Sequence, residues 1–173
     1  MVRKTKIAFG GGCHWCTEAV FQSLIGVSKV EQGFIASANE NNTFSEAIIV
    51  HFNPNEITLE VLTEIHLLTH KSTSQHSMRR KYRSAIYVFS KKQKIKSLQI
   101  ITSLQKDYKQ KIITQVLGFV EFKLSDSKFE NYYYSDPEKP FCETYINPKL
   151  TLLLANFSKH VNTNKLNHLT ASL

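Results

Sequence analysis

The amino-acid sequence predicts an α/β fold of the α+β kind: a two-layer ferredoxin-like sandwich with a mixed or antiparallel sheet and a C-terminal extension. Segments typical of strands and helices follow one another in the order β-α-β-β-α-β, and a further helix and strand come after them. A polar turn at residues 39–42 joins the second and third strands, which makes them antiparallel neighbours. The 173 residues, 42% of them hydrophobic, suffice for one core.

The first half of the chain begins with a short apolar strand at residues 6–9, which runs into three glycines. Apolar side chains then recur at helical spacing through residues 18–24, until Gly26 ends the helix. Residues 27–37 and 44–52 alternate as two strands. Gly33, inside the first of these strands, indicates a bulge or a close backbone approach.

The next elements are marked by capping residues. Thr58 precedes a helix that carries apolar side chains on one face: Leu59, Leu62, Ile65 and Leu68. Residues 84–89 form a strand, Ser90 caps a helix that extends to about Tyr108, and residues 112–117 form another strand. We expect one domain over residues 1–161 and a flexible, loosely held tail over residues 162–173.

Apolar patterning and cysteine usage indicate a cytoplasmic protein. No run approaches the roughly 18 apolar residues of a membrane span, so no membrane association is expected. The basic residues at the start lead into only a few apolar residues, unlike a signal peptide. Three cysteines, an odd number, fit reduced and chemically used thiols better than a disulfide framework.

The formal net charge of +8 is concentrated in the second part of the chain. Residues 1–70 carry 4 basic and 7 acidic side chains, whereas residues 71–173 carry 18 basic and 7 acidic ones. Phosphate or an acidic protein would suit the densest basic stretch, which comprises Arg79, Arg80, Lys81, Arg83, Lys91, Lys92, Lys94 and Lys96. Because aromatic residues are not interleaved with these charges, a solvated helix face is favoured and nucleic-acid binding is not expected.

The most informative motif is Cys13-His14-Trp15-Cys16, directly after the glycines at residues 10–12. It predicts a strand, a permissive turn and the first turn of a helix. Backbone amides and the helix dipole favour the thiolate there, which is the nucleophilic form of cysteine. The chain has one more cysteine, Cys142, so a reactive Cys13 has two possible resolving partners, Cys16 and Cys142.

Three other interpretations of the cysteine pair remain open. A zinc site would need Cys142 and a histidine, or two of the scattered histidines, and no second pair has metal-ligand spacing, so no metal is expected. A thioredoxin-like redox pair would use the same strand, turn and helix start. Both thiols could also be inert core residues, because free cysteine is among the most buried residue types.

Four stretches of the chain occur in a characteristic order. They are the Cys13 motif with its flanks at residues 8–19, the strand start at Ser45-Glu46-Ala47, the segment from Tyr82 to Tyr87, and the region from Tyr132 to Pro137 with Cys142. Over roughly residues 6–145 these motifs resemble the peptide methionine sulfoxide reductase A family, whose signature is Gly-Cys-Phe-Trp, often followed by Cys. The resemblance implies an oxidoreductase that reduces methionine S-sulfoxide, peptide-bound or free, to methionine.

The chain departs from the family pattern at several positions. His14 replaces the usual phenylalanine, and Lys81 replaces the glutamine before Tyr82. Ser77 or a neighbour stands where an aspartate is expected, and the loop between Ser37 and Phe44 is short and lacks a tyrosine. The chain is therefore a divergent member, and the reaction is better determined than the substrate.

The resemblance and the chemistry together suggest roles for individual residues. Sulfoxide reduction needs a soft nucleophile and an acid that protonates the oxygen, and Cys13 and Glu46 supply them. Tyr82 is expected to donate a second hydrogen bond to the oxygen. Trp15, next to the thiol, offers the substrate methyl group an apolar seat, and the resemblance adds Tyr132 to the substrate site. His14 either replaces the missing aromatic wall or lowers the pKa of the thiol as an imidazolium.

Turnover would leave Cys13 as a sulfenic acid, with which a second thiol condenses. Cys16 is three residues away, so we expect a Cys13–Cys16 disulfide first and exchange of Cys142 onto Cys16 afterwards. The resemblance implies thioredoxin as the reductant. No cofactor is expected, and the protein is expected to be a monomer. Two other functions stay open: a general thiol-disulfide oxidoreductase using Cys13 and Cys16, and a basic module that binds nucleic acid or an acidic protein.

Overall fold

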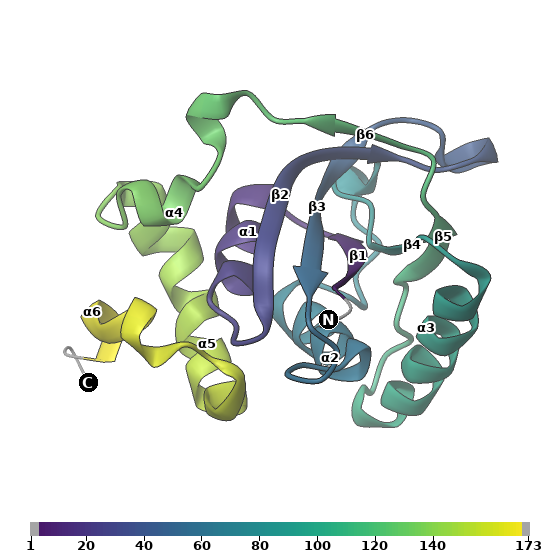
Figure 1. Ribbon diagram of the computed structural model, residues 1–173. Helices are drawn as coiled ribbons and strands as arrows, with labels where there is room; N and C mark the ends of the chain where they lie inside the picture. The colour runs from purple at the N-terminus through teal and green to yellow at the C-terminus, as the bar shows by residue number, and fades with distance from the viewer. Residues whose placement is uncertain (1–3, 171–173) are drawn as a thin grey trace.

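Six strands form one sheet in the order β5-β4-β1-β3-β2-β6 in the computed structural model, which describes residues 4–170 (Figure 1). All neighbours are antiparallel except β4 and β5, which are parallel. The central order β4-β1-β3-β2 is that of the ferredoxin-like β-α-β-β-α-β unit, so the predicted fold class is confirmed. The strands are β1 (Thr5–Gly10), β2 (Val27–Ala36), β3 (Ser45–Phe52), β4 (Ala85–Val88), β5 (Gln115–Gly118) and β6 (Glu121–Leu124).

Strand β1 lies in the middle of the sheet and ends where two neighbours begin. Gly10 is paired with Ala47 of β3 on one side and with Ala85 of β4 on the other. The last residue of β1 therefore meets the first residues of β3 and β4 at one edge of the sheet. That edge receives the Cys13 motif, Glu46 and Tyr82.

The helices cover one face of the sheet. Helices α1 (His14–Gln22) and α2 (Leu59–Thr69) belong to the ferredoxin-like unit, α3 (Lys91–Leu104) packs on α2, and α5 (Asn147–Phe157) contacts both α1 and α2. The short helices α4 (Tyr132–Ser135) and α6 (Asn167–Thr170) lie with α5 on the side of α1 away from α3 (Figure 1). The main core forms between these helices and the sheet, around Phe9, Phe21, Leu62, Ile65, Ile86 and Leu150.

Both predicted caps are confirmed. The Thr58 hydroxyl accepts a hydrogen bond from Val61 N at 3.2 Å, and the Ser90 hydroxyl accepts one from Gln93 N at 3.1 Å. Helix α3 ends at Leu104 rather than near Tyr108, because a 3-10 turn at Gln105–Asp107 follows it. Helix α1 begins at His14 with Cys13 as its N-cap, so its first turn lies at the cysteine motif, where it was predicted.

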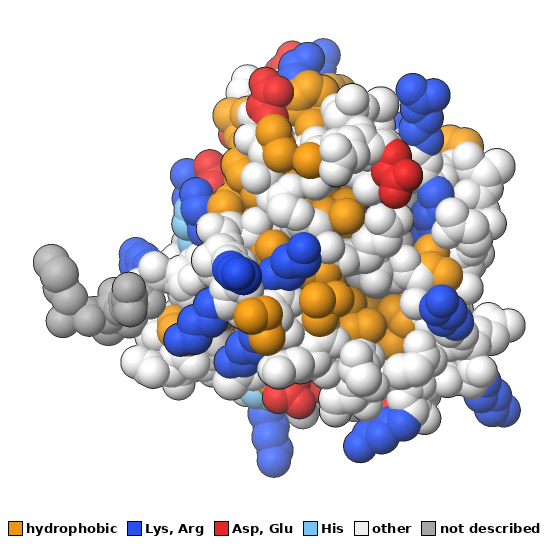
Figure 2. Space-filling view, turned by 90° about the vertical axis from the view of Figure 1, so that its right-hand side faces the viewer, with side chains coloured by type: hydrophobic (Ala, Val, Ile, Leu, Met, Phe, Trp, Pro, Cys, Tyr) orange, Lys and Arg blue, Asp and Glu red, His pale blue; other side chains and the backbone are white. Residues whose placement is uncertain are grey.

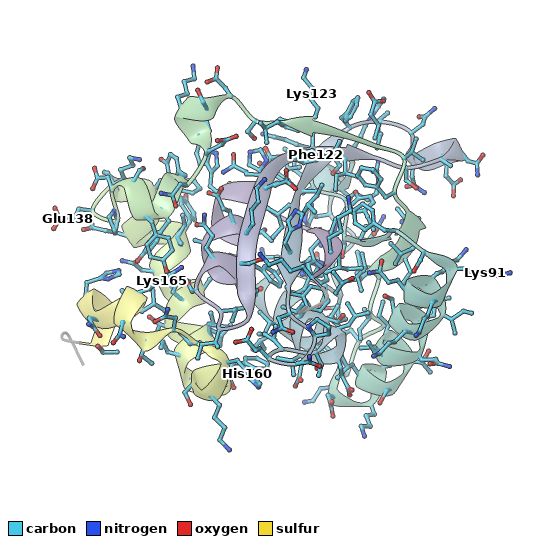
Figure 3. All side chains as sticks on the ribbon, in the orientation of Figure 1. Lys91, Phe122, Lys123, Glu138, His160 and Lys165 are labelled. Atoms are coloured by element: carbon cyan, nitrogen blue, oxygen red, sulfur yellow. The ribbon has the colours of Figure 1, made fainter. Side chains whose placement is uncertain are left out.

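The opposite face of the sheet carries a smaller apolar cluster around Ile35, Ile49 and Tyr87. Strand β6, which the sequence patterns did not predict, contributes Phe122 to it, while the neighbouring Lys123 extends away from the sheet (Figure 3). At Gly33 the backbone of β6 comes so close that a Cβ atom would lie 2.2 Å from the Lys123 carbonyl oxygen. The close approach predicted at Gly33 is thus present.

The C-terminal segment is packed rather than loose over residues 162–170. Asn162 N donates to the Ser23 carbonyl at 2.8 Å, and the Leu166 side chain is fully buried. The His168 ring shares a hydrogen bond with the Tyr133 hydroxyl at 2.6 Å. The expected flexible tail therefore does not describe residues 162–170, because one buried leucine and a few polar contacts fix them to the end of α1 and to Tyr133 of α4. Residues 171–173 lie outside the described residues.

Within residues 4–170 no helix is long and apolar enough to cross a membrane. Nor does any group of three or more His, Cys, Asp or Glu side chains in this part of the chain have a geometry that could hold a metal ion. Lysines and arginines are spread over the side of the molecule formed by α3, with hydrophobic side chains between them (Figure 2). Lys91, at the start of α3, extends into solvent (Figure 3), and Ile95 and Leu98 of the same helix are exposed.

Candidate active site

Cys13 occupies the N-cap position of α1, directly after the turn that follows β1. Its carbonyl oxygen accepts hydrogen bonds from Cys16 N at 3.1 Å and Thr17 N at 3.2 Å, which starts the helix. A Cβ atom at Gly11 would lie 2.4 Å from the His70 ring, so only glycine fits at that point of the turn. The half-buried Cys13 is thus placed where free backbone amides converge.

The pKa of the Cys13 thiol is lowered from its ordinary value. The main cause is a hydrogen bond from the Cys16 thiol, and the backbone amides of Trp15 and Cys16 act in the same direction. Burial and the Glu46 carboxylate oppose this effect. Of the two thiols of the motif, Cys13 is therefore the one that ionises more readily.

The other two cysteines hold their protons. The pKa of Cys16 is raised, first because its thiol donates a hydrogen bond to Cys13 and then because it is buried. Burial also raises the pKa of Cys142. Cys142 begins a π-helical turn at Cys142–Ile146 that contacts α1, and its side chain is fully buried. Cys142 therefore lies in a packed helical turn, directly after the proline-containing segment at residues 137–140.

Glu46, the second residue of β3, faces the start of α1. Its Oε2 accepts a hydrogen bond from His14 N at 3.1 Å, and the residue is only 8% exposed. The Glu46 charge also acts on the Cys13 thiol. The structure therefore brings the predicted acid and nucleophile together, although they are 33 positions apart in the sequence.

Tyr82 is connected to Glu46 through Lys81. The Lys81 ammonium lies 3.9 Å from Glu46 Oε1, and the hydrogen bond that it shares with Tyr82 is the main reason why the pKa of Lys81 is raised. The backbone reinforces this arrangement, because Glu46 N donates to the Lys81 carbonyl at 3.0 Å. Among residues 4–170, no hydrogen bond joins Tyr82 directly to Glu46.

Arg79 fixes the turn that carries Tyr82 to the turn that carries Cys13. One of its terminal nitrogens donates to the Gly11 carbonyl at 2.9 Å and to the Tyr82 carbonyl at 3.0 Å. The same guanidinium also binds the carbonyls of Ser74 and Lys71. The buried arginine therefore sets the spacing between these two turns.

Aromatic rings surround Trp15, the residue after His14. The Tyr132 ring stacks on the indole with centroids 4.1 Å apart and planes 8° from parallel. Phe129 and Phe141 contact the same indole, at 5.4 and 5.2 Å, and the Lys139 ammonium lies 4.2 Å from the Tyr132 ring centre. The Trp15 indole N–H is buried without a partner among the described residues. Trp15 and Tyr132, both predicted substrate-binding residues, thus form one stack.

Glu18 holds this stack together from the next turn of α1. Its carboxylate accepts hydrogen bonds from Asn131 N at 3.0 Å, Tyr132 N at 3.1 Å and the Gln32 amide at 3.0 Å. Burial raises the pKa of the Glu18 carboxyl, and these hydrogen bonds oppose the rise. Asn131 has a φ of 54°, a left-handed conformation that asparagine tolerates better than most residues. Glu18 therefore determines where Tyr132 meets Trp15.

The His14 ring is buried beside β2. Its Nδ1 lies 2.8 Å from the Gly33 carbonyl, which can only accept, so Nδ1 carries the hydrogen. The ring packs edge-on against Phe34 at 5.1 Å. These contacts favour the first of the two roles expected for His14, that of a wall in place of an aromatic residue.

Several functional contacts come from residues that the sequence analysis missed. Lys149 of α5 is half-buried, donates to the Thr69 carbonyl, and its positive charge favours the thiolate forms of Cys16 and Cys13. Glu18 looked like an ordinary helical position, and Arg79 like part of a solvated basic stretch. The only signal of these three residues in the sequence was their charge, at positions within or beside the motifs.

The chain is similar to known proteins in both sequence and fold. A sequence model of the family described as peptide methionine sulfoxide reductase matches residues 5–162. The peptide methionine sulfoxide reductase MsrA of Deinococcus radiodurans is 32% identical over 161 residues, which cover 84% of this chain and 78% of that protein.

Solved structures show the same fold. Mxr1 of Saccharomyces cerevisiae in its reduced form has a TM-score of 0.71 at 21% identity, over 83% of this chain and 91% of that chain. Mxr1 in complex with Trx2 gives a TM-score of 0.59 at 21% identity, over 75% of this chain and 85% of that chain.

Proposed function

Because the chain belongs to the peptide methionine sulfoxide reductase family, we propose that it reduces methionine S-sulfoxide to methionine with Cys13 as the nucleophile. The family is the one that the linked motifs indicated. The assignment of residues rests on how Cys13 and Glu46 are placed together at the start of α1. Cys13, whose thiol has a lowered pKa, occupies the N-cap position of the helix, and the buried Glu46 carboxylate accepts a hydrogen bond from the next backbone amide, that of His14.

The first step transfers the sulfoxide oxygen to Cys13. The Cys13 thiolate attacks the sulfur of the substrate, Glu46 protonates the oxygen, and methionine leaves while Cys13 becomes a sulfenic acid. Lys81 and Tyr82 stand beside the acid and support the developing charge on the oxygen. The substrate methyl group lies against Trp15, whose stack with Tyr132 fixes the indole.

The second step forms a disulfide. The Cys16 thiol, already hydrogen-bonded to Cys13, attacks the sulfenic sulfur, and water leaves. Cys142 then attacks the Cys16 sulfur, which moves the disulfide to Cys16–Cys142 and returns Cys13 to its thiol form. Lys149 favours the Cys13 thiolate that leaves in that exchange, and the Cys16 thiolate that leaves when the external reductant attacks the Cys142 sulfur.

A thioredoxin-type dithiol would complete the cycle by taking up the disulfide. The solved complex of yeast Mxr1 with Trx2 supports this choice of reductant. Each cycle consumes one methionine sulfoxide and one external dithiol, and it yields methionine, water and one oxidised dithiol. Oxidised proteins and free methionine sulfoxide are both expected substrates.

Single-turnover reduction of the resolved sulfoxide epimers of dabsyl-methionine tests the proposal. Without reductant, the wild-type chain is expected to convert one equivalent of the S epimer and to lose two titratable thiols. Cys13→Ser should form no product, while Cys142→Ser should keep the single turnover. Stoichiometric reduction by Cys13→Ser would overturn the assignment of Cys13.

A general thiol-disulfide oxidoreductase remains the second candidate, because the hydrogen bond between Cys16 and Cys13 would serve disulfide exchange equally well. Insulin reduction distinguishes the two functions. That activity would not depend on Glu46, so Glu46→Gln should leave it unchanged and lower only sulfoxide reduction. Fast insulin reduction without any sulfoxide reductase activity would favour the second candidate.

A further inference from the structure

A cavity of about 400 Å³ lies beside the edge of the sheet that carries the active site. It is bounded by the loop before β3, the turn at Ser77–Arg80 and the start of β5. Three arginines line it, Arg79, Arg80 and Arg83, against a single carboxylate, the exposed Glu40. Most of its remaining lining consists of neutral polar side chains, including Asn42, Thr43 and Gln115.

Two of these arginines are buried without a negative partner. Arg79 is 8% exposed and Arg83 6% exposed. Arg79 donates only to backbone carbonyls, and Arg83 donates to the Tyr87 hydroxyl and to two oxygens of Thr43. Within residues 4–170, no carboxylate lies within ion-pair distance of either guanidinium. Buried charges are normally paired, so this cavity has an uncompensated positive charge.

Some N–H groups of the arginines in this cavity also have no hydrogen-bond acceptor among the described residues. A guanidinium has five N–H groups, and the contacts of Arg83 use three of them. Its Nε has no partner among the described residues, and neither does the guanidinium of the exposed Arg80 at the rim. Planar arginine donors suit the oxygens of carboxylates and phosphates.

We propose that this cavity is a binding site for an oxyanion, carboxylate or phosphate, held by Arg80 and Arg83 with Arg79 as a second buried charge. Two sources can supply that chemistry: an Asp or Glu side chain of the oxidised protein, or a free phosphate. The first source rests on the proposed function and would make the cavity a specificity site for acidic sequences around the oxidised methionine. Arg79 links the cavity to catalysis, because it donates to the Gly11 carbonyl, two residues before Cys13.

Calorimetric titration of the full chain with inorganic phosphate and with acetate, at constant ionic strength, tests the site itself. Saturable binding is expected for the wild type, and Arg80→Gln should weaken it about tenfold through loss of a charged hydrogen bond. Lys94→Gln, which removes an equal charge from the exposed face of α3, is the matched control and should bind as the wild type does. Absence of binding, or equal binding by both variants, would overturn the proposal.

Kinetics with peptide pairs separate the two sources. The two peptides of a pair differ only in having Glu or Gln at one position, which lies up to about four residues before or after the methionine sulfoxide. An extended chain of that length reaches across the site. A lower KM for a Glu peptide that disappears in Arg80→Gln, and that added phosphate competes away, identifies a substrate carboxylate. Phosphate binding without any Glu preference identifies a free-ion site. If no peptide is reduced, the proposed function fails, while the titration still decides the anion site.

Discussion

The turn that carries Cys13 and the segment that closes over Trp15 are held in place in different ways. The first follows a central strand paired on both sides, packs Gly11 against His70, and receives the Arg79 guanidinium on a carbonyl. The second, residues 129–142, lies outside the sheet. Its attachment to α1 is made by side chains. The Glu18 carboxylate accepts two of its backbone amides, Gln22 and Ser23 form hydrogen bonds with Asn131 and Tyr134, and the rings of Phe129, Tyr132 and Phe141 pack on Trp15.

This difference suggests that the turn at Cys13 serves the first chemical step, whereas the closing segment serves substrate recognition and disulfide recycling. Backbone pairing fixes the turn at Cys13, so substitutions there change the reacting groups and leave their framework intact. Side chains fix the closing segment, which carries Tyr132 and leads to Cys142; the buried Glu18 carboxylate is one of them, because it accepts two backbone amides of the segment. Changes in that region should therefore act on substrate binding and on disulfide exchange, with little effect on the first chemical step.

The largest effect on the chemical step is expected from Glu46→Gln. Loss of a positioned general acid should lower the single-turnover rate by about 10² to 10⁴. Rapid-quench measurement of methionine formation gives this rate, and Glu60→Gln, an exposed carboxylate of α2, is the control. If the rate falls by less than a few-fold, Tyr82, Lys81 or water protonates the oxygen instead. The turn at Cys13 and its neighbours would then not hold the acid of the first step.

Cys142→Ser tests the recycling role of the closing segment. One turnover and one Cys13–Cys16 disulfide per substrate should remain, because those thiols already share a hydrogen bond. Steady-state turnover with thioredoxin should fall about tenfold or more, since the reductant must attack a half-buried disulfide at the start of α1. Mass spectrometry of the quenched enzyme identifies the disulfide, and accumulation of a Cys13 sulfenic acid would instead make Cys142 the direct resolving thiol.

Glu18→Gln tests whether the carboxylate sets the position of the aromatic stack. The amide leaves a buried backbone N–H unpaired, so unfolding should become easier by about 1–3 kcal/mol. KM should rise about tenfold, with a nearly unchanged single-turnover rate at saturation. Trp15 is the only tryptophan, so its fluorescence reports the stack directly. Glu143→Gln, exposed on the Cys142–Ile146 turn, is the control, and an unchanged spectrum and KM would exclude this role of Glu18.

The smallest effect is expected from Cys16→Ala on the titration of Cys13. The Cys16 thiol is the main cause of the lowered Cys13 pKa, so its removal should raise that pKa toward the ordinary value. The midpoint of the iodoacetamide alkylation rate then moves to higher pH, and alkylation at neutral pH slows a few-fold. Cys142→Ala should leave the midpoint in place. A midpoint unchanged in Cys16→Ala would assign the lowered pKa to the backbone amides alone.

Much of the framework was predictable because its signals are local. Each of these features depends on residues only a few positions apart: the alternation of the strands, the caps at Thr58 and Ser90, and the close approach at Gly33. The position of Cys13 was predictable for the same reason, since a cysteine after three glycines and before a helix lies where amides stabilise a thiolate.

The sequence by itself determined the ferredoxin-like unit, the helix caps at Thr58 and Ser90, and the place of Cys13 at a helix start, because periodicity, capping and turn residues act between near neighbours. Only the tertiary structure decided which distant groups serve that cysteine. Glu18 reaches residues 131 and 132, Arg79 reaches Gly11, and Lys149 acts on Cys16, all across more than 60 positions of chain. Such pairs have no local pattern, because packing of the sheet and helices alone brings them within reach of a hydrogen bond or a charge.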